Sequence, residues 1–503
     1  MATEPIGYAR LVGAYDLPAR ALATTAVSDT AVKGRQTVDQ GDIELMRFEP
    51  KYRPEATLAG DLQFALRYEG IDLEVLALLF AKTGGAEFED WLVKQPESSF
   101  ARRVGYLYEW LTDHELAASV PLKAAYVPVL DERLQFGVAD GVKNTKFRVI
   151  DNLPGNRRFC PLVRKTPFLR EMVEKDLKRR TQQVLAKYDR DLLRRAAAFL
   201  YLKETHSSFD VERENPSPDR AQRFADLLRQ AETGAPLSEE RFAELQNAVV
   251  DARFHELSYR TRQNWVGWDL GYRKQVDFIP ARPEDVPDLM GGLVELSETL
   301  RARPESIDAV VLAASLAFGF VFIHPFMDGN GRLHRYFVHE VLSSAGFTPK
   351  GIVLPVSAVI LASLDEYVHV LERFSKPLLA RTRYNPDVPG APATGNDAVY
   401  FRYFDATEQV SFLYRALERT VEHDLEQEIT FLRGSDTART RLNGLADWPD
   451  HSLDLFIRVV HQNQGKLSYT KRQSHFAWMT DDEVTRFECI VAEAFASNGT
   501  AAE

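Results

Sequence analysis

Residues 324–335 read HPFMDGNGRLHR, and this stretch constrains the fold more than any other part of the 503-residue chain. The preceding segment, residues 307–323, is almost wholly apolar, which is typical of a helix that is buried on all sides. It is shorter than the about 20 residues that a membrane span needs. Pro325 ends this helix, because a residue that precedes proline avoids the α region. The sequence therefore predicts that His324 lies at the end of a buried helix.

The second half of the stretch combines turn-forming residues with the start of another helix. Residues 328–331 tolerate positive φ angles, and an amphipathic helix is expected over residues 332–342. Consecutive N–H groups at such a helix start, together with the helix dipole, converge on an anion. Arg332 and Arg335 are three residues apart and share one helix face. Their guanidinium groups match phosphate oxygens.

Two further side chains complete a set of groups suited to phosphate chemistry. Asp328 is a hard oxygen ligand, suited to a Mg²⁺ ion that phosphates and water otherwise hold. His324 is a base that works near neutral pH. An Asp-Gly-Asn-Gly segment alone would be an ordinary turn, so the prediction depends on the whole string. An anion site, two arginines, a carboxylate and a base together predict phosphate-transfer chemistry.

The string resembles the signature of the Fic (Fido) family, His-Pro-Phe-x-Asp-Gly-Asn-Gly-Arg-x-x-Arg, at every defined position. The resemblance covers residues 190–380. It implies a mainly α fold, in which a helical core carries a β-hairpin flap. It also implies transfer of AMP from ATP, with Mg²⁺, to a Ser, Thr or Tyr hydroxyl of a target protein.

The resemblance assigns a role to each residue of the motif. His324 would take the hydroxyl proton as general base, and Asp328 would hold Mg²⁺. The phosphates would be bound by Gly329, Asn330, Gly331, Arg332 and Arg335. Phe326 would be buried and would fix the loop that carries the base.

A second stretch lies where self-inhibited Fic proteins carry an inhibitory helix, of the kind called class II. It reads THSSFDVERE from residue 205 and follows an apolar helical stripe. Similarity to the pattern Ser/Thr-x-x-x-Glu-Gly/Asn assigns inhibitory positions to Ser208 and Glu212. It implies that Glu212 pairs with Arg335 and keeps that arginine from orienting the terminal phosphate.

Three alternatives remain open at this point. Arg213 departs from the Gly or Asn that ends the inhibitory pattern, and Glu214 is a nearby substitute carboxylate. Some self-inhibited Fic proteins remove AMP, in which case Glu212 would position a water molecule. A third hypothesis is a DNA-binding or toxin–antitoxin-type regulator whose Fic core only senses nucleotide.

Residues 265–280 predict a β-hairpin, with its turn at residues 269–271. By resemblance this hairpin is a flap over the active site that aligns the target segment by strand addition, mainly through main-chain bonds. The docking residues assigned to it are Val276, Asp277, Phe278 and Ile279. The alternative is a surface hairpin without a binding role.

Composition narrows the class of protein and its compartment. Hydrophobic residues make up 45% and charged residues 27%, as in soluble globular proteins. The net charge of −11 argues against a protein that binds polyanions with its whole surface. Cys160 and Cys489 are far apart, which predicts a reducing compartment without disulfides. No apolar signal core is present at the N-terminus, so we expect a cytoplasmic protein without a membrane anchor.

The chain divides into three predicted regions. Residues 1–165 form a small α+β accessory domain, for which a winged-helix-like module is one possibility, and residues 125–138 alternate like a strand. Residues 166–395 form the Fic domain with its inhibitory helix, and residues 396–503 form a helical region. The basic residues of 157–195 are expected on a solvated helical face, because acidic residues are interspersed. DNA contact by the first region, self-modification and a homodimer are further hypotheses.

Overall fold

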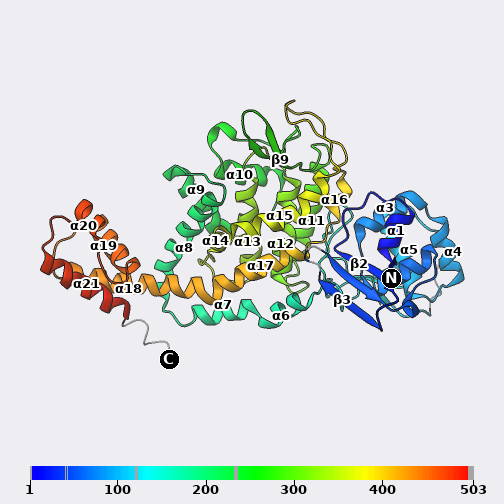
Figure 1. The fold of residues 1–503 in the computed structure, drawn as a ribbon, viewed down its shortest axis with the longest axis horizontal. Helices are drawn as coiled ribbons and strands as arrows, with labels where there is room; N and C mark the ends of the chain where they lie inside the picture. Colours follow the sequence, from blue (N-terminus) through cyan, green and yellow to red (C-terminus); the bar gives the residue numbers. More distant parts are fainter. Residues whose placement is uncertain (1–2, 40, 42, 119–122, 232–235, 497–503) are drawn as a thin grey trace.

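The structure is a computed structural model that describes residues 3–39, 41, 43–118, 123–231 and 236–496. It is mainly α-helical, which confirms the predicted fold class. Figure 1 shows three parts along the longest axis: an N-terminal α+β region (blue), a large helical body, and a C-terminal helical arm (red).

The N-terminal region combines helices with two small sheets. One sheet is mixed, has the order β1-β2-β4-β3 and pairs β2 with β4 in parallel, whereas the other has the order β5-β7-β6. The buried faces of the helices form a core of their own, which includes Leu62, Leu76 and Leu107. In chain order the elements are β1 (Thr3–Pro5), α1 (Tyr8–Ala14), β2 (Thr24–Asp29), β3 (Arg35–Asp39), β4 (Glu44–Phe48), the 3₁₀ turn Pro50–Tyr52, α2 (Leu58–Tyr68), α3 (Leu73–Thr83), α4 (Ala86–Lys94), α5 (Ser99–Thr112), β5 (Val127–Pro128), β6 (Val142–Asn144) and β7 (Val149–Asp151).

The strand expected over residues 125–138 is wrong in most of its length. Within it, Val127–Pro128 pair with β7 as β5, and Gln135 forms an isolated bridge with Arg164. The chain then turns, because the Asp131 side chain accepts the N–H of Arg133 over 3.0 Å. The apolar residues of the segment are buried in loop conformation instead, among them Val129, Leu130, Phe136 and Val138.

The helical body begins with α6 and extends into α18. Its centre is the pair α12 and α13, which pack against each other. Residues 324–329 form the loop between these helices, and residues 330–335 form the start of α13. In chain order the elements are α6 (Pro167–Lys175), α7 (Leu177–Leu185), α8 (Arg190–Val211), α9 (Pro218–Gln230), α10 (Glu239–Val249), the 3₁₀ turn Ala252–Phe254, β8 (Val266–Asp269), β9 (Lys274–Phe278), α11 (Val286–Arg301), α12 (Ala309–Ile323), α13 (Asn330–Ser344), α14 (Val356–Ala362), α15 (Leu364–Leu379), α16 (Ala398–Arg402), α17 (Thr407–Arg419), a π turn (Thr420–Asp424) and α18 (Leu425–Asn443).

Helix α12 is enclosed by other helices because it is apolar on every side. Its start is fixed by Asp308, whose side chain accepts the N–H groups of Val310 (2.9 Å) and Val311 (3.1 Å). Nearly all of its residues are buried. The helix therefore forms a rigid support for the loop that follows it.

The predicted hairpin is present. Strands β8 and β9 pair antiparallel, with a bulge between Val266 and Gly267. Gly271 adopts a φ of 77° in the connecting turn, a conformation that favours glycine. In Figure 1 the hairpin lies at the edge of the helical body, beyond α10.

The C-terminal part contributes to two cores. Helices α16 and α17 and the start of α18 pack into the body as far as Ile429. A separate core starts at Ala438, near the end of α18. It is completed by α19 (Asp450–Gln462), α20 (Tyr469–His475) and α21 (Asp481–Ala496). Figure 1 shows α18 as the connection between the body and this arm.

Basic residues within 157–195 such as Arg180, Lys187 and Arg195 have exposed side chains, as predicted for that segment. Several of them form ion pairs with acidic residues of α17, the π turn and α18. The pairs are Lys175–Glu418, Arg180–Glu422, Lys187–Glu426 and Arg195–Asp436. Exposed pairs of this kind contribute about 0–1 kcal/mol each. They join the segment from α6 to the start of α8 to the continuous run of α17, the π turn and α18, which lies beside it in Figure 1.

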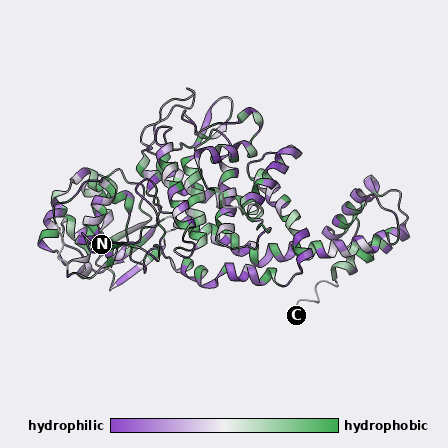
Figure 2. Cartoon of the chain, turned by 180° about the vertical axis from the view of Figure 1, so that it is seen from behind, coloured by the Kyte–Doolittle hydropathy of each residue, from purple (hydrophilic) through white to green (hydrophobic). Residues whose placement is uncertain are grey.

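The distribution of hydropathy agrees with this layout. Figure 2 shows hydrophobic residues gathered on the inner faces of the central helices, whereas the outer faces of α6, α7 and α18 carry more hydrophilic residues. Among the described helices, none combines the length and the apolar composition that a membrane crossing requires.

Candidate active site

His324 is the residue at which α12 ends. Its backbone adopts a left-handed conformation with φ of 56°, and its N–H donates to the carbonyl of Phe320 over 2.9 Å. Ring atom Nδ1 lies 3.2 Å from the carbonyl oxygen of Val321. A carbonyl only accepts, so Nδ1 carries the proton and Nε2 carries the lone pair. Burial of the ring, and then the charge of Arg260, lower the pKa of His324 to about 4, which keeps the ring neutral at pH 7.

Arg260 holds the end of α12 in this conformation, and no sequence motif marks it. Its buried guanidinium donates from Nε to the carbonyl oxygen of His324 over 2.7 Å and from Nη2 to that of Ile323 over 3.3 Å. Its other donors reach the carbonyls of Arg262 and Ala281, on either side of the hairpin. Burial lowers the pKa of Arg260 to about 10. This arginine therefore connects the end of α12, at His324, to both sides of the hairpin.

We expect Arg260→Met to lower stability and catalysis together. The substitution leaves the buried carbonyls of His324 and Ile323 without this donor, and each such group costs about 1–3 kcal/mol. Denaturant titration should therefore show a loss of about 2–6 kcal/mol in the free energy of unfolding. Arg262→Met, an exposed arginine two residues away, is the matched control and should change little. Equal stabilities for the two variants would contradict this role.

The loop between the two helices is held by side-chain amides. Asn330 Nδ2 donates to the carbonyl of Phe326 over 2.8 Å, and Asn330 Oδ1 accepts the Phe326 N–H over 3.1 Å. Asn264 donates a second bond to the same carbonyl over 3.1 Å. The Phe326 side chain is fully buried beside Tyr259, as predicted. The Asn330 amide thus positions the loop, which leaves only its backbone N–H for the predicted anion contact.

The N-terminus of α13 provides the donors of an anion site. Gly329 precedes the helix with φ of 91°, and its N–H donates to Asp328 Oδ1 over 2.6 Å. Within the part of the chain that the structure describes, the N–H groups of Asn330 and Gly331 have no acceptor. Such N–H groups, at the positive end of a helix dipole, bind anions. The predicted phosphate site therefore has its backbone donors at these two residues.

Arg332 is 2% exposed and already carries protein acceptors. Nη1 donates to Glu214 Oε2 over 3.0 Å and to the Val249 carbonyl over 2.9 Å, and Nη2 donates to Asp328 Oδ1 over 2.9 Å. The guanidinium also lies 5.4 Å from the ring centroid of Phe209. Glu214, proposed from sequence as a substitute carboxylate, therefore contacts the first arginine of the motif and leaves the second to Glu212.

Arg335 is 1% exposed and is bound by the end of α8. Nε donates to Ser208 Oγ over 2.8 Å, and Nη2 donates to the Ser208 carbonyl over 2.7 Å and to Glu212 Oε1 over 2.9 Å. A β-carbon placed on Gly331 would clash with Glu212 Oε1. The Glu212 carboxylate thus covers both Arg335 and the first turn of α13. The contact that the sequence predicts between Glu212 and Arg335 is present.

Arg213 has a physical reason to differ from the family pattern. Helix α8 ends with Arg213 in a left-handed conformation, φ of 57°, a position that glycine or asparagine usually takes. Other residues pay about 1–2 kcal/mol for this backbone. The Arg213 guanidinium lies 5.1 Å from the ring centroid of Trp268, on strand β8. Arg213, which stands where the family pattern has Gly or Asn, therefore connects the end of α8 to the hairpin.

Helix α8 is anchored to the body by a buried polar cluster. Glu204 is fully buried; its Oε1 lies 2.7 Å from His339 Nε2 on α13, and its Oε2 accepts the Ser357 N–H over 2.8 Å. The Ser357 hydroxyl also bonds to Glu204. These contacts fix the helix about two turns before Glu212 and so determine where its carboxylate lies.

Asp328 and Glu256 are the acidic groups of the loop. Asp328 is partly exposed and uses Oδ1 for the bonds to Gly329 and Arg332 described above. Glu256 Oε1 accepts the Met327 N–H over 2.8 Å, and burial, with a smaller contribution from the charge of Asp328, raises the pKa of Glu256. In the residues that the structure describes, no group of three or more His, Cys, Asp or Glu side chains could hold a metal. The role of Asp328 as a ligand of a Mg²⁺ ion held otherwise by phosphates and water stays a prediction.

The four hairpin residues assigned to target docking differ in exposure. Phe278 is 8% and Ile279 1% exposed, and Phe278 packs beside Phe374, so their side chains belong to the core. Val276 and Asp277 are partly exposed. A docking role for these residues remains a prediction, and for the two buried ones it is restricted to the backbone.

Comparisons with known proteins agree with this site. The profile of the Fic/DOC family matches residues 236–342, which include α10, the hairpin and the whole motif. A Fido domain-containing protein of Dictyostelium discoideum is 38% identical over 104 residues, which cover 20% of this chain and 67% of that protein. Fold and site therefore define a Fido-domain protein. The chain belongs to the Fic/DOC family.

Other relatives match over shorter shares of their length. The protein adenylyltransferase Fic of Nematostella vectensis is 37% identical over 73 residues, or 14% of this chain and 17% of that protein. The protein adenylyltransferase fic-1 of Caenorhabditis elegans is 33% identical over 97 residues, or 19% and 16%. This chain thus matches only about a sixth of each adenylyltransferase.

Two solved structures match parts of the chain. A Fic domain-containing signaling protein from Bacteroides thetaiotaomicron has a TM-score of 0.35 at 23% identity, with 50% of this chain and 96% of that chain covered. A Fic family protein from Desulfovibrio desulfuricans has a TM-score of 0.34 at 19% identity, with 62% and 88% covered.

Proposed function

We propose that the protein transfers AMP from ATP to a hydroxyl side chain of a target protein. The observation that carries the proposal is the position of a neutral histidine, His324, directly before the anion-binding start of α13. Names of relatives that match this segment point to the same chemistry. In this reaction a hydroxyl oxygen attacks the α-phosphorus of ATP, the bond to the β-phosphate breaks, and pyrophosphate leaves.

Each residue of the motif has a separate role in the proposed reaction. Nε2 of His324 accepts the proton of the attacking hydroxyl. The N–H groups of Asn330 and Gly331 stabilise the negative charge that develops on the phosphate oxygens. Arg332 and Arg335 bind the departing pyrophosphate. Asp328 would hold Mg²⁺, which neutralises phosphate charge when bound.

Glu212 restrains this activity in the proposed mechanism. Its carboxylate takes up the Arg335 donor and the space above Gly331 that a phosphate needs. Glu214 occupies Arg332 in a parallel way. Phosphates can bind both arginines only after the turn at residues 212–214 has moved. The restraint is therefore a competition between carboxylates of the chain and phosphates of ATP.

AMP removal is the second candidate, because the same geometry places Glu212 at the site. Glu212 would then orient a water molecule toward the α-phosphorus of an AMP-modified side chain. The test that separates the two reactions is the replacement of Glu212, with label on protein as the readout, which is developed in the Discussion.

We expect Trp268→Ala to tighten ATP binding by about 2- to 5-fold. The substitution removes the cation–π contact that helps to hold Arg213 and the turn, and such contacts contribute about 0.5–1 kcal/mol at exposed sites. Calorimetric titration of ATP measures this effect without a target protein. Tyr272→Ala, an exposed aromatic of the same hairpin that lacks this contact, is the control. An unchanged affinity in Trp268→Ala would show that the contact does not support the restraint.

A further inference from the structure

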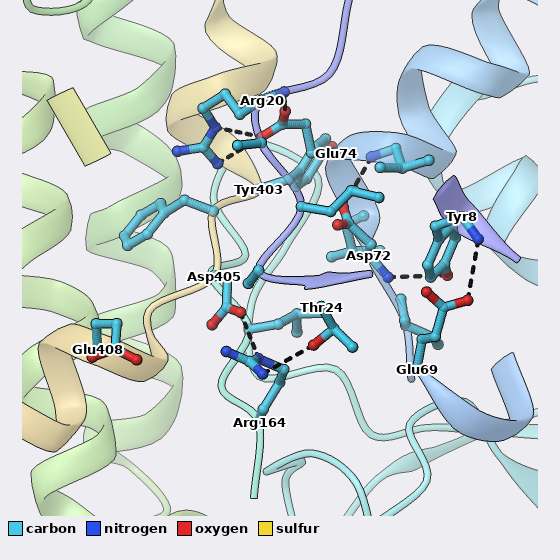
Figure 3. A pocket seen from close by; sticks show the side chains of 18 of the residues that line it. Tyr8, Arg20, Thr24, Glu69, Asp72, Glu74, Arg164, Tyr403, Asp405 and Glu408 are labelled. Atoms are coloured by element: carbon cyan, nitrogen blue, oxygen red, sulfur yellow. Dashed lines mark hydrogen bonds and ion pairs between the residues drawn. The ribbon is translucent and has the colours of Figure 1, made fainter. Parts of the chain in front are cut away.

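A cavity of about 310 Å³ lies between the N-terminal core and the helical body, apart from the residues of the candidate active site. Its walls come from the first helices and strands, from Arg164, from α15 and from the segment that joins α16 to α17 (Figure 3). The volume is at the lower end of the range for small-molecule sites. Five carboxyl groups and three arginines line it, together with apolar and aromatic side chains.

Two of the arginines are already neutralised by carboxylates. Arg20 bonds to Glu74 through its backbone N–H (2.7 Å), Nε (2.7 Å) and Nη2 (2.6 Å). Arg164 donates to Asp405 Oδ2 over 2.8 Å and to Glu44 Oε2 over 2.9 Å. These pairs leave the cavity with carboxyl groups that have no cation.

Glu69, Asp72 and Glu408 are those groups, and of the three Glu408 is exposed. Glu69 Oε1 accepts the Tyr8 N–H over 3.1 Å, and Asp72 Oδ1 accepts the Val75 N–H over 2.9 Å. Among the described residues, no arginine, lysine or histidine forms an ion pair with either carboxyl, and Glu69 Oε2 is buried without a hydrogen-bond partner. Figure 3 shows both residues on one side of the cavity, across from Asp405 and Glu408.

A third acceptor comes from the opposite wall. Gln409 is 2% exposed and lines the cavity, and its Oε1 also lacks a partner. The amide orientation is fixed, because Nε2 donates to the Val370 carbonyl over 3.2 Å. Among the described cavity residues, the buried side-chain atoms without a partner are therefore two oxygens. Gln409 Oε1 is an acceptor, and Glu69 Oε2 is an acceptor when the carboxyl is ionised, so a cationic ligand can satisfy both by donating hydrogen bonds.

The raised pKa values of Glu69 and Asp72 also agree with a site that lacks a cation. Burial raises the pKa of Glu69 to about 8, with Asp72 and Asp61 adding to the rise and the Tyr8 N–H opposing it. Burial raises the pKa of Asp72 to about 7. There Glu74 and Asp405 add to the rise, and the Val75 N–H and Arg20 oppose it. A bound cation would favour the ionised form of both groups.

From these contacts we infer that the cavity is a binding site for a small organic cation, with an ammonium or guanidinium group held by Glu69 and Asp72 and a further donor directed at Gln409. Carboxylates bind such groups by charge-assisted hydrogen bonds. The ligand would connect the N-terminal region to α15 and α17, since residues of all three line the cavity.

The test titrates the full chain with agmatine, which carries one guanidinium and one ammonium group. Calorimetry should detect binding below about 10 mM, and Glu69→Gln should weaken it by about tenfold or more. Glu69→Gln keeps an oxygen for the Tyr8 N–H, and its melting temperature in the absence of agmatine should be no lower than that of the unmodified chain. Glu97→Gln, an exposed carboxyl of the same region, is the matched control.

A second readout separates binding in the cavity from binding at the surface. At pH 7 Glu69, with a pKa of about 8, is mostly protonated, and Asp72, with a pKa of about 7, is about half protonated. Agmatine that ionises both must therefore release about 1–1.5 protons per molecule bound. The proton count follows from calorimetry in two buffers of different ionisation enthalpy. Equal affinity in the unmodified chain and Glu69→Gln, no binding at about 10 mM, or equal stabilisation by the neutral analogue n-butanol would each overturn the inference.

Discussion

We expect Glu212→Gly to label itself with AMP about 10- to 100-fold faster than the wild-type chain does, in the presence of α-labelled ATP and Mg²⁺. The substitution frees one N–H of Arg335 Nη2, whose other N–H stays bonded to the Ser208 carbonyl, and it opens the space above Gly331. Hydrogen bonds to charged groups contribute about 1.5–3 kcal/mol, and about 1.4 kcal/mol corresponds to a factor of ten. Because Glu212 competes with phosphate, the affinity for ATP should rise in the same range.

The control for Glu212→Gly is Asp210→Gly. Asp210 is an exposed carboxylate in the last turn of α8, so its replacement costs similar helix stability but leaves the contacts of Arg335 intact. No label in either variant, with ATP binding confirmed by calorimetry, would move the proposed function to AMP removal or to nucleotide sensing. A protein substrate that already carries AMP then decides between these two, since loss of AMP removal in Glu212→Gly identifies the reverse reaction.

His324→Ala, introduced into the Glu212→Gly variant, is expected to lower AMP transfer by about 10²- to 10⁴-fold. The loss follows from the absence of the base that accepts the hydroxyl proton. ATP affinity should stay within about twofold, because the donors of the phosphate site belong to α13. His255→Ala, an exposed histidine before the hairpin, is the control. Retention of transfer in the double variant would exclude His324 as the base.

The pH dependence gives an independent check on the same residue. The pKa of His324 lies at about 4, below the ordinary 6.5, so the neutral base persists as pH falls from 7 toward 5. The acid limb of the rate profile should therefore appear near pH 4. Since the folded chain resists protonation of this ring, His324 also contributes to a loss of stability as pH falls below 6.5. An acid limb near pH 6.5 would mean that the ring is more solvated than the structure shows.

Local rules account for the parts of the site that were predictable. The apolar run before His324 and the glycines after it determine a buried helix, a turn and a second helix, and each is present. The hairpin followed from the turn residues at its tip. The contact between Glu212 and Arg335 did not follow from local rules, because it was expected only from the resemblance to self-inhibited Fic proteins.

Positions that depend on tertiary packing were not predictable in this way. Arg260 lies in a segment without periodicity, and its role depends on carbonyl groups that only the folded chain brings together. Glu204 reads as one more charged residue of a helix, although burial and His339 make it an anchor. The alternation over residues 125–138 was misread as a strand, because buried loop residues produce the same pattern.

The left-handed conformation of Arg213 has a consequence for how firmly the turn at residues 212–214 is held. A residue other than glycine raises the free energy of this turn by about 1–2 kcal/mol. The contact with Trp268 stabilises the turn by only about 0.5–1 kcal/mol. If Glu212 restrains transfer, the form in which Glu212 contacts Arg335 is thus less populated with arginine at position 213 than it would be with glycine there. The chain should then show a measurable background activity, and its level should depend on whether the hairpin is free or occupied by a target.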